Sequence, residues 1–289
     1  MDKTIGFIGL GLMGEGFTRR LVEKGYRVIG YDIDAKRAAA AAGWGVTSAK
    51  NAADVATQSD IILCCVINTA AVEDAALGVS GVVNTPKPTG KIFIDHSTTE
   101  LEATRRMAAA LAEKGMSFID APVSGGPGAA KAGTLAIMAG GDGAAIAKAA
   151  PVLADLGTMT HMGAVGTGQA TKLVNQTLVL TNYCVIAEAL RLAESYGVDA
   201  TKIPKALATG HAGSNLLAAA MPQMIAEDFV PRGFARQVLK DLEMLQAAAR
   251  EQHLAMPMAS QALTLYRLLV ASGKSELDAT AVVTLYPKH

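Results

Sequence analysis

The sequence is poor in several kinds of residue, and each shortage excludes a class of protein. It has three cysteines, Cys64, Cys65 and Cys184, and neither these nor the five histidines are spaced like metal ligands. Basic and acidic residues balance at 26 each, and no basic block is present that would release counterions from nucleic acid. We therefore expect buried thiols in a reducing compartment, no metal site, and no nucleic-acid partner.

Segments that lead a chain to a membrane are also lacking. No run of about 18 apolar residues is free of polar or charged groups, as a spanning helix would need. The N-terminus has no basic region followed by a long apolar run and a small-residue cleavage site, which a signal peptide requires. The sequence therefore predicts a cytoplasmic protein without a membrane partner.

Apolar residues make up 51% of the 289 residues, enough for a large buried core. Up to residue 163, short and wholly apolar β-type runs alternate with helical stretches, which predicts a parallel sheet covered on both faces. The expected strands are Thr4–Gly9, Arg27–Asp32, Ile61–Ile67, Lys91–Asp95, Ser117–Asp120 and Thr134–Ala139. The expected helices in this part are Met13–Lys24, Ala35–Ala42, Glu100–Lys114 and Ala144–Leu153.

Beyond Gly168 no further strand is expected. Gln169–Tyr196 has helical periodicity without Pro or Gly, longer than a usual globular helix, so it is expected to link two domains or to form a subunit interface. The expected later helices are Ala200–Thr209, Ser214–Ile225, Ala235–Glu251, Met256–Ser272 and Ala279–Thr284. We predict a doubly wound α/β (Rossmann) domain over residues 1–163 and an all-helical domain for substrate and dimerisation over residues 164–289.

The segment after the first strand fits the pattern G-x-G-x-x-G. Its residues are Gly9, Leu10, Gly11, Leu12, Met13 and Gly14. The pattern alone is weak, but here it follows a strand, opens a helix, and is followed by a second strand that ends in Asp32. The glycines allow a tight turn, close approach of the backbone to a pyrophosphate, and helix–strand packing. The sequence thus predicts a dinucleotide site at this turn.

Asp32 stands where a carboxylate binds the ribose 2′-hydroxyl and repels a 2′-phosphate. This residue favours NAD over NADP. Lys36 and Arg37 follow on a predicted helix and are expected to be solvated charges, although both are close enough to hold a phosphate. NADP therefore stays open as an alternative.

Three further segments follow later β-type runs: Asp95-His96-Ser97-Thr98, Asp120-Ala121-Pro122-Val123-Ser124-Gly125-Gly126, and Gly166-Thr167-Gly168 leading to Lys172 and Asn175. With the glycine motif and Lys240-Asp241-Leu242, they resemble the signatures of the β-hydroxyacid dehydrogenase family. That family includes 3-hydroxyisobutyrate dehydrogenase and tartronate semialdehyde (2-hydroxy-3-oxopropionate) reductase and, more distantly, 6-phosphogluconate dehydrogenase. The resemblance extends over nearly the whole chain, with the motifs in the family order.

The resemblance implies a catalytic centre. Lys172 would accept or donate the proton of the reacting alcohol, a task for which burial can adapt a lysine. Asn175, on the same helix face at i+3, would help to orient the substrate. Ser124, Gly125 and Gly126 would bind its carboxylate, for which a hydroxyl and exposed N–H groups are suited.

The resemblance also implies further cofactor contacts at Cys65, Val66, Thr98 and Lys240. Asp241 would then be a structural or orienting neighbour of Lys240. A histidine base, either His96 or His211, remains an alternative to the lysine. The chain departs from many relatives where Gln176 replaces a second asparagine after Asn175, at a place where side-chain size and polarity affect the substrate.

We therefore expect a nicotinamide-dependent oxidoreductase that acts on a short β-hydroxy acid or semialdehyde, such as 2-hydroxy-3-oxopropionate or succinic semialdehyde. Oxidation of 3-hydroxyisobutyrate is the alternative within the family. Two alternatives from other classes are a non-catalytic dinucleotide sensor and an oxidative decarboxylase of a phosphorylated sugar acid. No basic cluster near Lys172 supports the latter. A homodimer or homotetramer is expected from the long apolar helix and from the resemblance.

Overall fold

The chain forms two compact units. The computed structural model describes residues 4–288, and the units meet between Lys172 and Leu173. The division falls inside the long helix, later than the boundary predicted after residue 163. The reason is local, because the first turn of that helix is hydrogen-bonded to the sheet of the first unit through Asp120.

The first unit contains a sheet with the strand order β3-β2-β1-β4-β5-β6-β8-β7, and β9 pairs with β8. Neighbouring strands from β3 to β6 run parallel, whereas β8 is antiparallel to β6 and β7. From β1 the strand order continues to β2 and β3 on one side and to β4, β5 and β6 on the other. The order therefore reverses between β1 and β4, the switch point where doubly wound sheets bind ligands. The strands are β1 (Thr4–Ile8), β2 (Arg27–Tyr31), β3 (Val46–Ser48), β4 (Ile61–Cys64), β5 (Ile92–Asp95), β6 (Ser117–Asp120), β7 (Val123–Ser124), β8 (Leu135–Gly141) and β9 (Gly157–Gly163).

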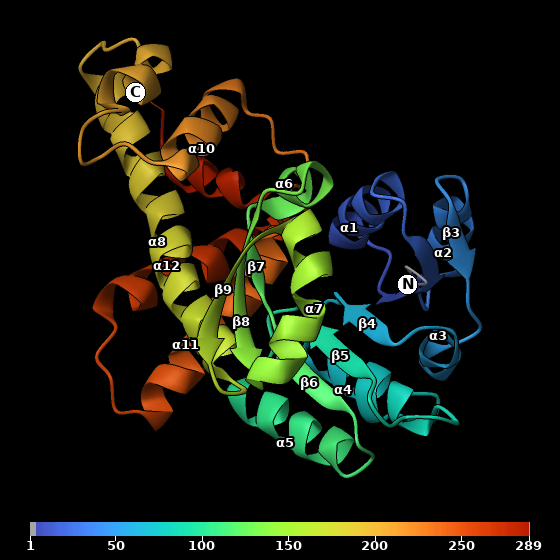
Figure 1. Cartoon of the computed structure of the whole chain (residues 1–289). Coiled ribbons are helices and arrows are strands. Elements are labelled where there is room, and N and C mark those ends of the chain that lie inside the picture. Colours follow the sequence, from blue (N-terminus) through green and yellow to red (C-terminus); the bar gives the residue numbers. More distant parts are fainter. Residues whose placement is uncertain (1–3, 289) are drawn as a thin grey trace. The chain divides into compact units, whose positions relative to one another are not determined.

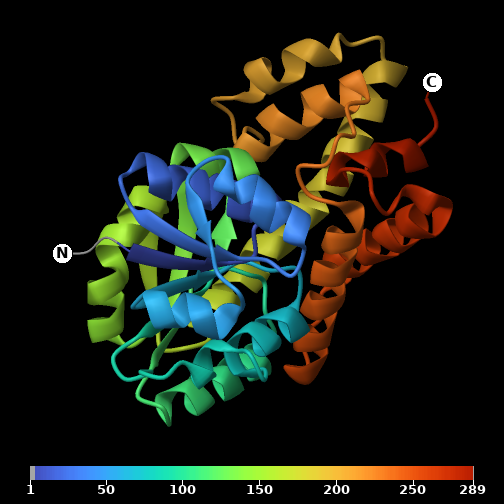
Figure 2. The same cartoon turned by 90° about the vertical axis from the view of Figure 1, so that its right-hand side faces the viewer.

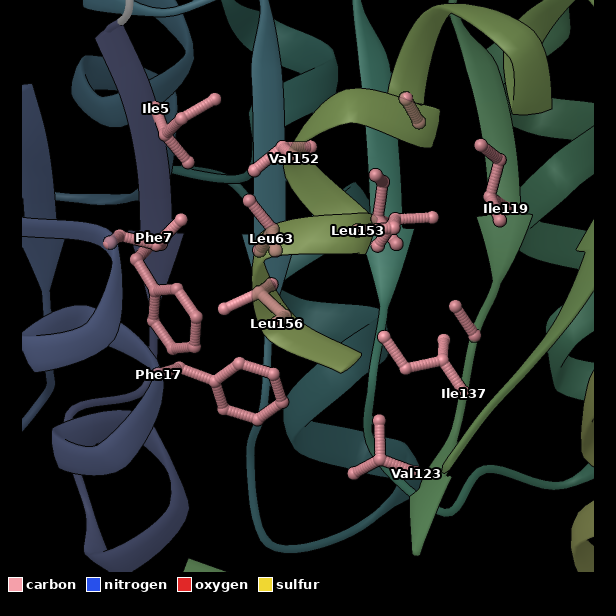
Figure 3. Packing of buried hydrophobic residues seen from close by; sticks show 14 of the residues in the cluster. Ile5, Phe7, Phe17, Leu63, Ile119, Val123, Ile137, Val152, Leu153 and Leu156 are labelled. Atoms are coloured by element: carbon pink, nitrogen blue, oxygen red, sulfur yellow. The ribbon is translucent and has the colours of Figure 1, made fainter. Parts of the chain in front are cut away.

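Helices cover both faces of this sheet (Figures 1 and 2). One core cluster joins the sheet to α1, α6 and α7, and a second joins it to α3, α4 and α5. In the first cluster, Phe17 of α1 packs beside Phe7 of β1, and Leu153 and Leu156 of α7 lie over the strands (Figure 3). The helices are α1 (Leu12–Glu23), α2 (Ala35–Ala42), α3 (Ala52–Gln58), α4 (Thr69–Leu77), η1 (Val82–Asn84), α5 (Leu101–Ala112), α6 (Gly126–Ala132) and α7 (Gly143–Leu156).

The predicted α/β class is confirmed, with differences in detail. The sequence did not predict β3, α3, α4, β7, α6 or β9, nor the antiparallel pairing of β8. Strand β4 ends at Cys64 rather than at Ile67, because the N–H of Val66 donates to the Ser97 hydroxyl (3.0 Å) instead of continuing the sheet.

In the part that the structure describes, the regular elements of the second unit are all helices (gold to red in Figure 2), with one isolated β-bridge between Phe234 and Asp278. Its core surrounds Tyr266, which is fully buried and donates its hydroxyl to the carbonyl of Ala279 (2.9 Å). Proline at the first turn starts α12, as its missing N–H allows. The helices are α8 (Thr167–Ser195), which begins in the first unit, then η2 (Ala200–Lys202), α9 (Ile203–Leu207), α10 (Asn215–Ala226), α11 (Ala235–Glu251), α12 (Pro257–Leu269), η3 (Val270–Lys274) and η4 (Ala279–Leu285).

Helix α8 differs from the expectation that no segment is suited to span a membrane. Its 29 residues reach a mean hydropathy of 1.2 over an 18-residue window, so by length and composition this one helix of the described chain is long and apolar enough to span. The core helix of a globular domain meets the same criterion. Leu180, Ala187 and Leu190 of α8 belong to the buried core of the helical unit, so one face of this helix packs inside that unit.

Candidate functional site

The loops at the carboxyl ends of the central strands are brought together by backbone hydrogen bonds just beyond the strands. The N–H of Gly9 donates to Tyr31, that of Cys65 to Ile8, and that of His96 to Cys64, all within 2.9 Å. This edge of the sheet therefore gathers the ends of β1, β2, β4 and β5, where doubly wound folds bind dinucleotides.

The three glycines of the motif, Gly9, Gly11 and Gly14, are required for different reasons. A Cβ on Gly9, whose φ is +94°, would lie 2.2 Å from the carbonyl oxygen of Cys65, and one on Gly14 would lie 1.9 Å from that of Gly9. A Cβ on Gly11 would meet only the guanidinium of Arg37, at 3.6 Å. The outer glycines are thus required by packing, whereas Gly11 faces open space into which a pyrophosphate fits.

The half-buried Met13 and the exposed Leu12 belong to the first turn of α1, which starts directly after this loop. The first N–H groups of a helix have no partner within the helix and attract phosphate. The glycine loop and this helix terminus therefore fit a bound dinucleotide.

Asp32 stabilises the glycine loop through hydrogen bonds to backbone N–H groups. Its Oδ2 accepts a hydrogen bond from the N–H of Leu10 (2.7 Å) and its Oδ1 accepts one from the N–H of Asp34 (2.8 Å). The side chain is 5% exposed, and the exposed guanidinium of Arg37 lies 3.9 Å away. Each carboxylate oxygen retains a further lone pair for a ribose hydroxyl.

Arg37 is exposed, as the sequence predicts, and it also lies close to two carboxylates. Its guanidinium is also 3.7 Å from Asp34, which caps the start of α2 through the N–H of Lys36. A cation therefore stands beside the predicted ribose site. This arrangement fits either cofactor, since Asp32 suits a ribose hydroxyl and Arg37 suits a 2′-phosphate.

The ends of β5 and β6 carry buried polar groups. The Asp95 carboxylate accepts from the Thr99 hydroxyl (2.6 Å) and from the N–H of Ser97 (2.9 Å). Burial raises the pKa of Asp95 to about 6, even though these hydrogen bonds oppose the change. Thr98, half-buried between these partners, is thereby held at the carboxyl edge together with Cys65 and Val66.

His96 does not have the properties of a general base. It is 3% exposed, stacks on Phe17 with ring centroids 4.9 Å apart, and contacts the carbonyl oxygen of Ala121 through Nδ1 (2.7 Å). Burial lowers the pKa of His96 to about 4. The other candidate, His211, is exposed before α10.

Asp120 anchors the long helix to the sheet. Its two carboxylate oxygens accept hydrogen bonds from the N–H groups of Gly166 and Gln169, each at 2.8 Å. The Gln169 side chain adds a bond to the carbonyl of Ser97 (2.8 Å) and accepts one from the N–H of Thr99 (3.1 Å). A Cβ on Gly168 would lie 2.4 Å from the carbonyl oxygen of Asp120, so a glycine is required where the helix meets the strand.

This anchor fixes the position of Lys172, one turn into α8. Lys172 is 8% exposed, and its ammonium donates to the carbonyl oxygen of Val123 (2.8 Å). Val123 directly precedes Ser124, which ends β7, and Gly125 and Gly126, which lead into α6 with φ of +128° and +72°. The structure therefore brings the predicted proton carrier to the strand that leads into the predicted carboxylate site.

Asn175 and Lys240 belong to the helical unit. The Asn175 amide donates to the side-chain oxygen of Gln176 (2.9 Å), and Gln176 in turn donates to Oδ2 of Asp241 (2.5 Å). The ammonium of Lys240 forms an ion pair with Oδ1 of Asp241 (2.9 Å). Asp241 is thus an orienting neighbour of Lys240 in this unit.

Sequence reasoning missed Gln169, noted Gln176 only as a departure from relatives, and quoted Asp95 and Asp120 only as parts of motifs. A usable signal existed for the two carboxylates, because an acidic residue that ends an apolar strand must find hydrogen-bond partners. Across residues 4–288, no group of three or more His, Cys, Asp or Glu side chains is arranged to hold a metal. In that same part of the chain, the three cysteines form no disulfide.

The doubly wound sheet, the glycine loop and the carboxylate after β2 define a nicotinamide-dinucleotide-dependent dehydrogenase. The model of the NAD-binding domain of 6-phosphogluconate dehydrogenase matches residues 4–174, and the NAD-binding model of NADP-dependent 3-hydroxyisobutyrate dehydrogenase matches residues 166–286. The chain therefore belongs to the β-hydroxyacid dehydrogenase family, as the resemblance implied.

Relatives match over nearly their whole length. The 2-(hydroxymethyl)glutarate dehydrogenase of Eubacterium barkeri is 34% identical, over 99% of this chain and 96% of its own. The 2-hydroxy-3-oxopropionate reductase of Escherichia coli is 34% identical, over 96% and 95%. The structure of Mycobacterium tuberculosis 3-hydroxyisobutyrate dehydrogenase with L-serine is 30% identical, with a TM-score of 0.86 over 99% of this chain and 100% of that one.

Proposed function

We propose that this protein transfers a hydride between NAD and a short β-hydroxy acid or its semialdehyde, with Lys172 as the acid–base residue. The carrying observation is the buried ammonium of Lys172 at 2.8 Å from the carbonyl of Val123, beside Ser124–Gly126. The nicotinamide, when bound, accepts or supplies the hydride. NADP is the second candidate cofactor because of Arg37 beside Asp32.

In this reaction, the residues of the chain would bind the substrate and move its proton. Ser124 and the backbone N–H groups of Gly125 and Gly126 bind the substrate carboxylate. In oxidation, neutral Lys172 accepts the hydroxyl proton as the carbinol C–H leaves as hydride; in reduction, the Lys172 ammonium returns that proton to the carbonyl oxygen. Asn175, one turn further along α8, orients the substrate, and Lys240 contacts the cofactor. A developing alkoxide is stabilised by the same ammonium.

Reduction of 2-hydroxy-3-oxopropionate or succinic semialdehyde is the form we propose first, and oxidation of 3-hydroxyisobutyrate second. The names of relatives support both, since they include a 2-hydroxy-3-oxopropionate reductase and a 3-hydroxyisobutyrate dehydrogenase. We also propose a cytoplasmic location, which the buried Cys64 and Cys184 thiols suit.

The test is an absorbance assay at the nicotinamide band with both cofactors and these substrates. Lys172→Ala should lower kcat by a factor on the order of 10²–10⁴, the usual loss for an acid–base group. Circular dichroism and NADH binding should be unchanged in the variant. The exposed Lys114 gives a matched control, and Lys114→Ala should keep full activity.

Near-normal turnover of the Lys172→Ala variant contradicts the role of the lysine. A native protein that binds NADH but converts none of the substrates favours the sensor alternative instead.

A further inference from the structure

The amide of Gln176 has a direction that chemistry determines. Its partner Asp241 is 9% exposed, Gln176 itself is 7% exposed, and their atoms Oδ2 and Nε2 are 2.5 Å apart. An ionised carboxylate can only accept hydrogen bonds. Gln176 must therefore turn its NH₂ group to Asp241, whose other oxygen Oδ1 forms an ion pair with the ammonium of Lys240 (2.9 Å).

The same constraint passes to Asn175. The side-chain oxygen of Gln176 can only accept, and it receives the bond from Nδ2 of Asn175 (2.9 Å). An isolated asparagine amide can turn over at little cost because its oxygen and nitrogen are nearly the same size. Here that turn would place two acceptor oxygens against each other. Asn175 is thus held with its carbonyl oxygen Oδ1 directed away from Gln176.

We propose that Gln176 is a positioning residue, which through Asp241 fixes Asn175 as a hydrogen-bond acceptor toward the substrate. The inference rests on the proposed function, because it takes Asn175 to orient the substrate one helical turn from Lys172. In this proposal, Asn175 contacts the substituent on the carbon next to the alcohol carbon. The favoured substrates are β-hydroxy acids that carry a donor there, a hydroxyl or an ammonium, rather than a methyl group.

Glycerate and 3-hydroxyisobutyrate form a matched pair for the test, because they differ in a hydroxyl against a methyl group on that carbon. We expect kcat/KM with NAD to be at least about tenfold higher for glycerate, since a polar site discriminates strongly against an analogue that leaves it unpaired. Gln176→Met removes the amide at similar size and should reduce this preference by roughly tenfold through KM and kcat, because small misplacements are costly.

Asp241→Asn is the second variant, because it keeps the shape of Asp241 but lets either amide direction occur. It should lose preference as Gln176→Met does, and the double variant should lose no more than the worse single variant if both act through Asn175. The exposed Gln261 gives the control, and Gln261→Met should change nothing. Thermal melting checks that each variant is folded.

A native preference for 3-hydroxyisobutyrate, or a glycerate preference retained in both variants, overturns the proposal. Calorimetric binding of the two acids to the NAD-loaded protein separates it from the proposed function. If neither acid is oxidised, the proposed function fails. Tighter binding of glycerate that depends on Gln176 would still support the role of Asn175 as an acceptor. Equal binding of the two acids would overturn that role.

Discussion

At the scale of single residues, the site depends on buried polar groups whose partners are few and specific. Asp95, Asp120 and His96 lie at the carboxyl ends of two neighbouring strands and are all at least 97% buried, with exposures of 0%, 0% and 3%. Burial without a cation raises the pKa of both carboxyls to about 6 and lowers the pKa of the imidazole to about 4. Burying these groups is electrostatically unfavourable. Their hydrogen bonds nevertheless position Ser97, Thr99 and the start of α8.

Asp95 gives a pH-dependent prediction. A carboxyl whose pKa is higher in the folded state stabilises the fold at low pH and loses that contribution as pH rises through about 4 to 6. Asp95→Asn keeps both hydrogen bonds, since its oxygen accepts from Ser97 and its NH₂ donates to Thr99. The free energy of unfolding of the variant should therefore exceed that of the native protein by a margin that grows as pH rises from 4 to 7, up to roughly 3 kcal/mol. Thermal melting at each pH measures this difference.

His96 acts in the opposite direction, because a lowered imidazole pKa makes folding more favourable as pH rises toward 6.5. For this reason the difference between variant and native protein is measured, not the native curve alone. Glu113→Gln, at an exposed position after α5, serves as the reference. An Asp95→Asn difference that stays constant with pH would show that Asp95 is ionised equally in both states.

At the scale of elements, the start of α8 is the most constrained feature of the first unit. Asp120 takes the place of an N-cap residue, although it is 46 residues before its partner Gly166. A carboxylate at a helix N-terminus also interacts favourably with the helix dipole. The first turn of the helix is therefore fixed against the sheet, and Lys172 donates to the carbonyl of Val123.

Gly168→Ala tests this junction. The added Cβ would lie 2.4 Å from the carbonyl oxygens of Asp120 and Met138, and such overpacking costs about 1–3 kcal/mol. We expect a lower midpoint in urea unfolding and a lower kcat, because Lys172 follows one turn later. Gly143→Ala, at the start of α7 with open space around its Cβ, should be neutral or slightly stabilising. Equal stability of the two variants would mean that the junction tolerates a shift.

At the scale of the whole molecule, α8 leaves apolar side chains uncovered. Leu178 and Leu192 are each 61% exposed and Val185 is 46% exposed. Seven-residue steps keep side chains on one helix face, so the three form a stripe of the kind that packs against another helix. We propose that this stripe contacts a second copy of the chain, in line with the expected homodimer or homotetramer.

Sedimentation velocity measures the assembly. The native protein should sediment as a dimer or tetramer, and the double variant Leu178→Glu with Leu192→Glu should sediment as a smaller species, since it buries two charges in the contact. Leu254→Glu, at another leucine that is 61% exposed, should leave the assembly intact. A monomeric native protein, or a double variant with the native sedimentation coefficient, would exclude this interface.

Features that depend on residues close together in the chain were predicted from the sequence. The glycine loop was predicted because its three glycines, the strand before them and the helix after them lie within a few residues of one another. Strand β2 and helix α2 were predicted to within a residue because their runs end at Asp32 and Gly43. The helices α3 and α4 were missed. Asn51 and Asn68 cap their first turns through their side chains, and an asparagine before a helical stretch is a signal that can be read from the sequence.

The pairs of polar residues that hydrogen-bond across the fold could be found only in the folded structure. Asp120 and Gln169 are 49 positions apart, as are Lys172 and Val123, and Gln176 and Asp241 are 65 apart. No periodicity records such pairs, because each depends on where two separately formed elements are packed. The physical reason is burial: a polar side chain removed from water must find a partner in space, and only the folded chain specifies which one is within reach.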